Sequence, residues 1–93
     1  MLFYLVVYDI PDDKRRKKVY DLLEGYGQWV QYSVFECVLP GRKYQELQKR
    51  LRRLINEQED HIRFYPLSSH TLEQVEIWGE GPAKREWPKS IVI

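Results

Sequence analysis

The sequence is poor in cysteine, and it has no long apolar run. A single cysteine, Cys37, and two histidines are present, which excludes an intrachain disulfide and disfavours a zinc site. A lone thiol fits a reducing cytoplasm. The apolar run at residues 2–8 is too short to cross a bilayer and lacks the basic segment and cleavage signature of a signal peptide. We therefore expect a cytoplasmic protein that does not contact a membrane.

Neither sign of charge is in large excess. Fifteen Lys and Arg residues stand against fourteen Asp and Glu residues, which gives a net charge of +1. This balance excludes a wholly basic nucleic-acid coat protein and an acidic disordered chain. The charge is uneven, because residues 1–53 carry eleven basic and seven acidic side chains (+4) and residues 54–93 carry four and seven (−3). We expect the first half to meet any polyanion.

The 93 residues, 43% of them hydrophobic, suffice for one domain with one small core. Strand-like runs of apolar, aromatic and β-branched residues occupy residues 2–8, 29–39 (broken near 31–33), 61–67 and, more briefly, 75–78. Apolar residues at helical spacing occur in two stretches. The first begins at residues 11–13 and ends at Gly25 and Gly27. The second follows the turn at Pro40 and Gly41 and has a basic outer face. No repeat or low-complexity block is present.

The order of these elements predicts an α+β fold, a ferredoxin-like βαββαβ sheet with two helices on one face and a short extra C-terminal strand. We assign residues 1–78 to this domain and residues 79–93 to a tail that can pair with a partner chain. Two helices cover only one face of the sheet, whereas residues 2–8 are apolar on both faces. A second copy packing sheet against sheet is the simplest cover, and a ligand or a tail that folds back is the alternative.

Asp9 is the most informative single position, because it follows the buried strand and precedes the start of a helix. An Asx turn or a helix cap is the plain structural interpretation. The C-terminal edge of a strand is also a place where ligand sites form, and Mg²⁺ takes few carboxylates, several waters and phosphate oxygens. In a two-fold dimer each Asp9 gains a symmetry mate, and such a pair forms a credible divalent-ion site.

Residues 14–18 are five consecutive cations. On a helical wheel the lysines point to solvent, whereas Arg15 and Arg16 lie on or beside the apolar stripe, next to Asp9. Guanidinium groups suit bidentate phosphate contact. The basic face of the second helix can extend a track along a duplex or can be ordinary solubilising surface. The candidate nucleic-acid contacts are Arg15, Arg16, Lys18, Lys49, Arg50 and Arg53.

A polar and aromatic cluster interrupts the second strand region. Ser33 as a nucleophile needs a positioned histidine base, and neither His61 nor His70 has a recognisable triad spacing. We therefore discount serine chemistry. Taken alone, Tyr8, Tyr32 and Phe35 are core or interface aromatics.

Residues 8–19, YDIPDDKRRKKV, followed by residues 31–35, QYSVF, resemble the CRISPR-associated Cas2 family, the smaller core proteins of spacer acquisition. The match covers roughly residues 1–78. The resemblance implies a homodimer, a divalent-metal-dependent phosphodiesterase acting on RNA or double-stranded DNA, and Mg²⁺ held by Asp9. It places catalytic positions at Tyr8, Asp9, Arg16 and Phe35. It also implies a partnership with the larger CRISPR integrase, in which the dimer can serve as a scaffold instead of a catalyst.

Trp29 departs from the resemblance, since some members have a basic residue there, and this argues against efficient RNA cleavage. Two other functions stay open. A toxin-like ribonuclease of the VapD type shares the fold and would explain the aspartate. An RNA-recognition module has the same strand order, but the basic and aromatic signature of its central strands is missing, so we rank it last.

Overall fold

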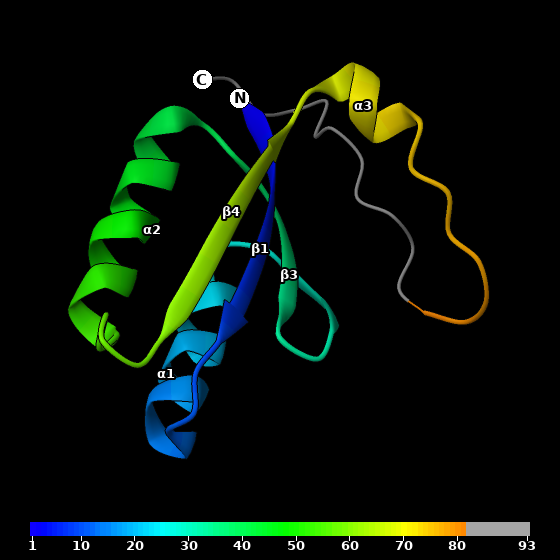
Figure 1. Ribbon diagram of the computed structural model, residues 1–93. Coiled ribbons are helices and arrows are strands. Elements are labelled where there is room, and N and C mark those ends of the chain that lie inside the picture. Colours follow the sequence, from blue (N-terminus) through cyan, green and yellow to red (C-terminus); the bar gives the residue numbers. More distant parts are fainter. Residues whose placement is uncertain (82–93) are drawn as a thin grey trace.

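The computed structural model describes residues 1–81. In chain order its elements are β1 (Leu2–Asp9), α1 (Asp13–Glu24), β2 (Gln28–Gln31), β3 (Val34–Leu39), α2 (Gly41–Leu54), β4 (His61–Leu67) and α3 (Ser69–Glu73) (Figure 1). The predicted pairing of the tail at residues 79–93 falls largely outside the described residues. Within residues 1–81, no helix is both long enough and apolar enough to span a membrane.

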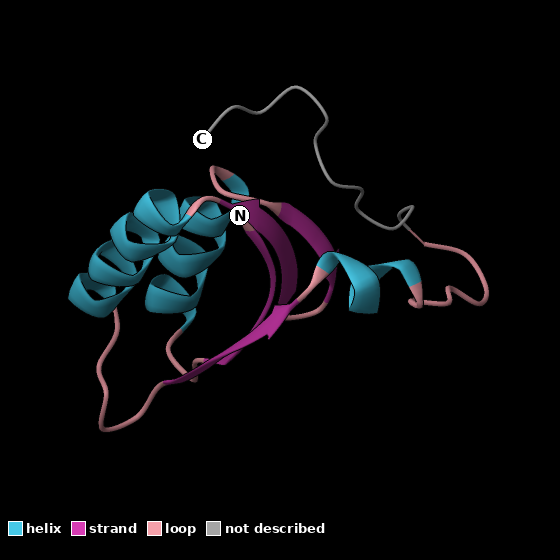
Figure 2. Ribbon diagram, turned by 90° about the horizontal axis from the view of Figure 1, so that it is seen from above, coloured by secondary structure: helices cyan, strands magenta, loops and turns pink. Residues whose placement is uncertain are grey.

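The strands form one antiparallel sheet in the order β2-β3-β1-β4, so that β1 is hydrogen-bonded on both edges. The long helices α1 and α2 lie on one side of the curved sheet, and α3 lies on the other (Figure 2). This order, with the βαββαβ succession, is the ferredoxin-like arrangement. The predicted α+β class, the broken strand at residues 29–39 and the strand at residues 61–67 are confirmed.

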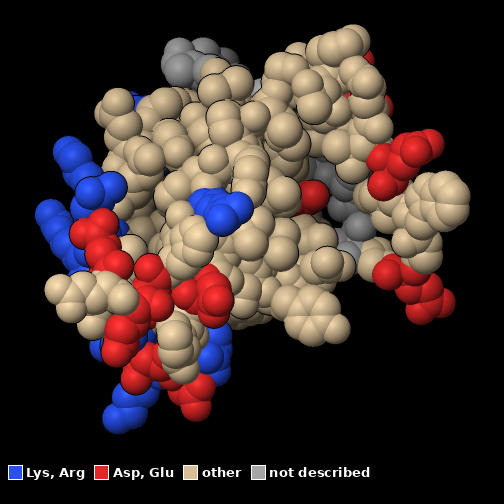
Figure 3. All heavy atoms as spheres, in the orientation of Figure 1, with Lys and Arg blue, Asp and Glu red and all other residues tan. Residues whose placement is uncertain are grey.

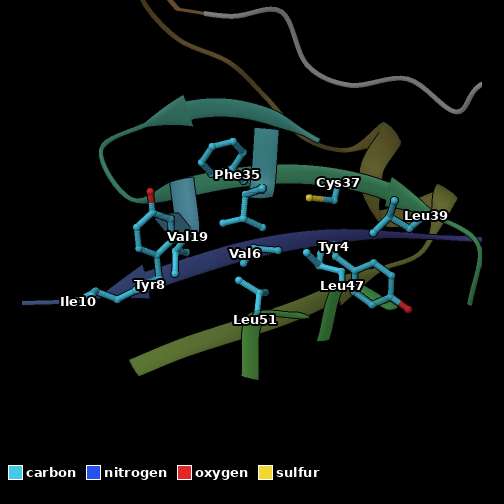
Figure 4. Packing of buried hydrophobic residues seen from close by; sticks show 11 residues of the cluster. Tyr4, Val6, Tyr8, Ile10, Val19, Phe35, Cys37, Leu39, Leu47 and Leu51 are labelled. Atoms are coloured by element: carbon cyan, nitrogen blue, oxygen red, sulfur yellow. The ribbon is translucent and has the colours of Figure 1, made fainter. Parts of the chain in front are cut away.

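The main core lies between the sheet and the two long helices. Alternate residues of β1, Tyr4, Val6 and Tyr8, point into it (Figure 4). The ring of Tyr4 stacks on that of Tyr44, with the centroids 3.8 Å apart. The other buried members are Ile10, Val19, Leu23, Phe35, Cys37, Leu39, Leu47 and Leu51. Because the helices bury every second residue of β1, the intervening residues face the other way.

A second, smaller cluster covers one end of the opposite sheet face. It consists of Phe3, Val38 and Leu72, and Val75 packs against it. Leu72 belongs to α3, whose N-cap is Ser68, with the Ser68 hydroxyl accepting a hydrogen bond from the amide of Thr71. Helix α3 and Val75 therefore cover this end of the face. The tail, whose folding back was the expected alternative, lies largely outside the described residues.

The prediction of a short strand at residues 75–78 is wrong for the part of the chain that the structure describes. These residues follow α3 in an irregular conformation. The Ser68 cap starts a helix where a turn was expected, and Val75 then packs by its side chain instead of by backbone pairing. Beyond it, Ile77 and Trp78 are exposed. A strand needs a neighbouring backbone, and no described strand of this chain pairs with these residues.

The remainder of this sheet face has no such cover within residues 1–81, apart from Leu5, which packs against the edge of the second cluster. We call it the open face, and define it by the outward residues Leu5, Val7, Asp9, Val34, His61, Arg63 and Tyr65. Leu5, Val7 and Val34 are half-buried, and Tyr65 is 43% exposed. The expectation that two helices leave one face of the sheet incompletely covered is thus confirmed.

Gly27 offers a direct test of the packing between the end of α1 and the sheet. A Cβ atom at Gly27 would overlap the carbonyl oxygen of Glu36 and the sulfur of Cys37. We expect Gly27→Ala to lower the free energy of unfolding by about 1–3 kcal/mol, as overpacked cores do. Gly41→Ala is the matched control, because a Cβ there meets nothing within 4 Å, and it should be neutral or slightly stabilising. Urea denaturation of both variants checks this, and equal stabilities would contradict it.

Candidate functional site

Asp9 is the last residue of β1 and lies on the open face, directly opposite His61 of β4. Its side chain is exposed. Among residues 1–81 no hydrogen bond or ion pair engages its carboxylate. The cap of the following helix is a different residue, Asp12, whose carboxylate accepts from the amide of Arg15 at 2.9 Å. Asp9 is therefore an exposed carboxylate without a helix-capping task.

The neighbouring strand β4 contributes a row of polar side chains to the same face. Arg63 donates from Nε to Nε2 of His61 at 3.0 Å and from a terminal nitrogen to the Tyr65 hydroxyl at 3.2 Å. Sequence reasoning missed this row. The signal was present, since Ile62 and Phe64 pack toward the helices and period-two alternation then places residues 61, 63 and 65 on the same face as Asp9.

Arg15 takes part in a structural ion pair. Its Nε lies 2.8 Å from Asp60, and a terminal nitrogen lies 2.8 Å from Glu59. The Asp60 side chain is inaccessible to solvent and also accepts from the amide of Asn56 at 2.8 Å. Arg15 holds the pKa of the Asp60 carboxyl below its usual range. These contacts link α1 to the loop between α2 and β4. They also neutralise the positive charge of Arg15, which was expected to contact a phosphate.

Arg16 braces the chain just after Asp9. Its guanidinium donates to the carbonyl oxygen of Ile10 at 3.0 Å and pairs with the carboxylate of Asp13. Its side chain remains 43% exposed. Arg16 thus lies at the same end of the sheet as Asp9, where its hydrogen bond fixes the backbone that leaves β1.

Tyr8 and Phe35 lie on the other side of the sheet from Asp9, inside the main core. They are 5% and 0% exposed, and their ring centroids are 6.4 Å apart. Burial raises the pKa of the Tyr8 hydroxyl, so the phenol stays protonated. The amide of Tyr8 donates to the carbonyl of Ser33 at 3.1 Å. Both side chains pack in the main core beneath the end of β1.

The β2–β3 turn lies at the same end of the sheet. Tyr32 has a φ of 43°, in the left-handed region, and is 87% exposed. The indole nitrogen of Trp29 donates to the Tyr32 carbonyl at 2.8 Å, which holds the turn in this conformation. The carbonyl oxygen of Ser33 accepts from the amide of Tyr8, and the Ser33 side chain interacts with the Tyr8 hydroxyl, which lowers the pKa of that hydroxyl against the larger effect of burial.

The candidate basic contacts of the helices form a separate surface. Lys18, Arg50 and Arg53 line one hollow between α1 and α2. Lys49 lines a neighbouring hollow together with the same two arginines. We call these four residues the helix-layer cations. Lys and Arg gather at the left-hand edge of Figure 3, where α2 lies in Figure 1, whereas the surface over the strands is largely free of charge. The helix-layer cations and Asp9 therefore lie on opposite layers of the molecule.

Within residues 1–81, no group of three or more His, Cys, Asp or Glu side chains is arranged to hold a metal ion. One chain offers Asp9 alone at the end of β1. An exposed, unpaired carboxylate fits Mg²⁺, which completes its octahedron with waters and phosphate oxygens instead of an all-protein cage.

Comparison with known proteins assigns the family. The family model described as CRISPR associated protein Cas2 matches residues 1–75. This chain belongs to the Cas2 family. The CRISPR-associated endoribonuclease Cas2 3 of Synechocystis sp. is 61% identical over 93 residues and is covered, like this chain, at 100%.

Solved structures agree with this assignment. A hypothetical protein from Thermus thermophilus is 46% identical, with a TM-score of 0.81 over 90% of this chain and 98% of that one. A chain of a partial Cas6-RT-Cas1–Cas2 complex is 33% identical, with a TM-score of 0.78 and full coverage of both chains. The family inferred from residues 8–19 and 31–35 is thus confirmed.

The ion pair between Arg15 and Asp60 predicts how stability depends on pH. Because the pKa of folded Asp60 is lowered, the stabilisation is present above the ordinary carboxyl pKa of about 4 and is lost as pH falls through the lowered value. Asp60→Asn should therefore cost about 2–3 kcal/mol at neutral pH, and its deficit against the wild type should shrink in acid. Asp21→Asn, at an exposed pair with Lys17, is the control. Urea unfolding checks both variants, and a deficit that persists unchanged in acid would contradict the assignment.

Proposed function

We propose that this chain is a homodimeric, Mg²⁺-dependent nuclease that cleaves phosphodiester bonds of RNA or double-stranded DNA and acts with the CRISPR integrase in spacer acquisition. The observation that carries the proposal is the exposed, unpaired carboxylate of Asp9 at the end of the central strand. The Synechocystis relative is named an endoribonuclease, and a structural relative comes from a complex that contains Cas1 and Cas2. Both names support an adaptation nuclease that partners an integrase.

Each residue of the site has a separate task in this proposal. Asp9 would hold the metal ion. The chemistry that bound Mg²⁺ supplies is activation of a water and neutralisation of charge on the phosphate. Arg16 holds the carbonyl of Ile10, the next residue. Tyr8 and Phe35 pack beneath the same strand end, so that the carboxylate is presented in a fixed direction.

The open face supports the dimer. Leu5, Val7 and Val34 are half-buried and Tyr65 is 43% exposed, so a second copy would remove apolar surface from water. Asp9 belongs to the same face. A two-fold contact there would give Asp9 a symmetry mate, and two carboxylates are a better ligand set for a divalent ion than one.

Asp9→Asn separates catalysis from folding. We expect Mg²⁺-dependent cleavage to fall by at least about 100-fold, since a group that stabilises charge at the reaction centre is typically worth that much. Unfolding free energy and solution mass should not change, because the side chain is exposed and unpaired. Cleavage of labelled RNA and duplex DNA, with Mg²⁺ or with EDTA, and light scattering measure these effects. Asp21→Asn should keep full activity; unchanged cleavage by Asp9→Asn would move the metal site elsewhere.

A second candidate function is a DNA-binding scaffold for the integrase, favoured by the helix-layer cations. They lie on the layer opposite Asp9, and Lys18 and Arg53 border the same hollow between α1 and α2. Cations spaced along a helix surface bind a duplex backbone through phosphates, without reading sequence. Binding there would not need the carboxylate of Asp9.

Duplex binding can be tested with two charge-matched double variants. Lys18→Gln with Arg53→Gln should weaken duplex DNA affinity and reduce the slope of log K against log salt by roughly 0.9 for each phosphate that the protein no longer neutralises. Lys17→Gln with Arg52→Gln removes the same charge from residues paired with Asp21 and Glu57, and should change the slope less. Fluorescence anisotropy at several salt concentrations measures both. Equal slopes for the two variants would assign the helix-layer cations to solubility.

A further inference from the structure

Arg63 takes no part in the ion pairs of the helices, and the motifs found in the sequence do not include it. We propose that Arg63 binds a phosphate of the polynucleotide beside Asp9 and thereby positions the substrate. This inference rests on the proposed nuclease function. It identifies a substrate-binding residue at that site, on a different strand from every residue that the sequence motifs indicated.

Sheet register places Arg63 near Asp9. Asp9 pairs with His61 and Val7 pairs with Arg63 across the β1–β4 ladder, so all of these side chains project from the open face. Diagonal neighbours, which are offset by two residues as Asp9 and Arg63 are, lie about 7–8 Å apart with their Cβ atoms somewhat closer, within reach of long side chains. A phosphate whose oxygens complete a metal site at Asp9 would therefore lie within reach of the Arg63 guanidinium.

Two neighbours hold the Arg63 guanidinium in place. The Nε2 atom of His61 accepts from it at 3.0 Å, and the Tyr65 hydroxyl accepts at 3.2 Å. Arginine has five N–H donors, so donors remain for a ligand. A side chain that is already ordered loses less conformational entropy when it binds.

The charge of Arg63 is not neutralised by the described part of the chain. Its hydrogen-bond partners, His61 and Tyr65, are not carboxylates, and no carboxylate of residues 1–81 forms a salt bridge with it. Arg15, by contrast, is paired with Glu59 and Asp60, and Arg16 with Asp13. A fixed, exposed guanidinium without a counter-ion, beside a carboxylate suited to Mg²⁺, is a suitable arrangement for binding a phosphodiester.

Steady-state kinetics of Arg63→Gln tests the inference. Loss of a charged hydrogen bond should raise KM roughly 10- to 100-fold, while kcat changes less than about threefold, as for a residue that binds substrate and transition state alike. Tyr65→Phe, which removes one acceptor that orients the guanidinium, should raise KM less. Arg63→Lys keeps the positive charge but loses the planar guanidinium, and its KM should lie between those of Arg63→Gln and the wild type. Lys17→Gln removes a charge that is paired with Asp21 and is the control.

A binding measurement without metal keeps this inference separate from the proposed function. In EDTA, fluorescence anisotropy with a labelled single-stranded RNA and with duplex DNA should show weaker binding by Arg63→Gln, with the salt slope reduced by roughly 0.7 for the RNA or 0.9 for the duplex. The polynucleotide, RNA or duplex DNA, for which the affinity of Arg63→Gln falls is the one that Arg63 binds. A weaker affinity in either arm supports Arg63 even if Asp9→Asn still cleaves.

Three results would overturn the role of Arg63. The first is an unchanged affinity for both polynucleotides together with an unchanged KM. The second is a fall in kcat with KM unaltered. The third is a change from dimer to monomer in light scattering of Arg63→Gln, because that would assign the side chain to the contact between two copies.

Discussion

Strand β1 is hydrogen-bonded on both edges, and its side chains alternate between two environments. Tyr4, Val6 and Tyr8 are enclosed by the long helices, which leaves Asp9 no position except the opposite face. A shift of register by one residue would press the Asp9 carboxylate against the helices without a partner, and burial of an unpaired charge is prohibitively costly. The hydrophobic core therefore sets the exposure of the proposed catalytic carboxylate.

The same alternation determines where the open face can function. Helix α3 covers the end of the face at Phe3 and Val38, and these residues lie at the opposite end of their strands from Asp9. The short helix thus removes apolar surface from water without approaching the carboxylate. What stays uncovered in the described chain is the end that combines half-buried apolar groups with Asp9 and Arg63. A contact between copies and a polar site can consequently share one surface.

Much of this arrangement could be predicted from the sequence, because strand and helix periods are local properties. The strand at residues 61–67 and the place of Asp9 at the end of the first strand were both found in this way. The strand expected at residues 75–78 was not formed, because the Ser68 cap and the burial of Leu72 decide that segment. Arg15 could not be assigned, since Asp60 is 45 residues away along the chain. Arg63 was overlooked because its significance depends on lying beside β1.

The positions of the cations determine whether the proposed cleavage and the proposed duplex binding would compete for one surface. Arg15 and Arg16, in the first turn of α1, are bound to carboxylates, so they stabilise the fold around Asp9 instead of attracting a polyanion. The helix-layer cations are separated from Asp9 by the thickness of the sheet and its core. A duplex held by them need not enter the site at Asp9, and a strand held by Arg63 need not touch the helices. The proposed cleavage and the proposed scaffolding would therefore use different surfaces of one molecule, and neither function would exclude the other.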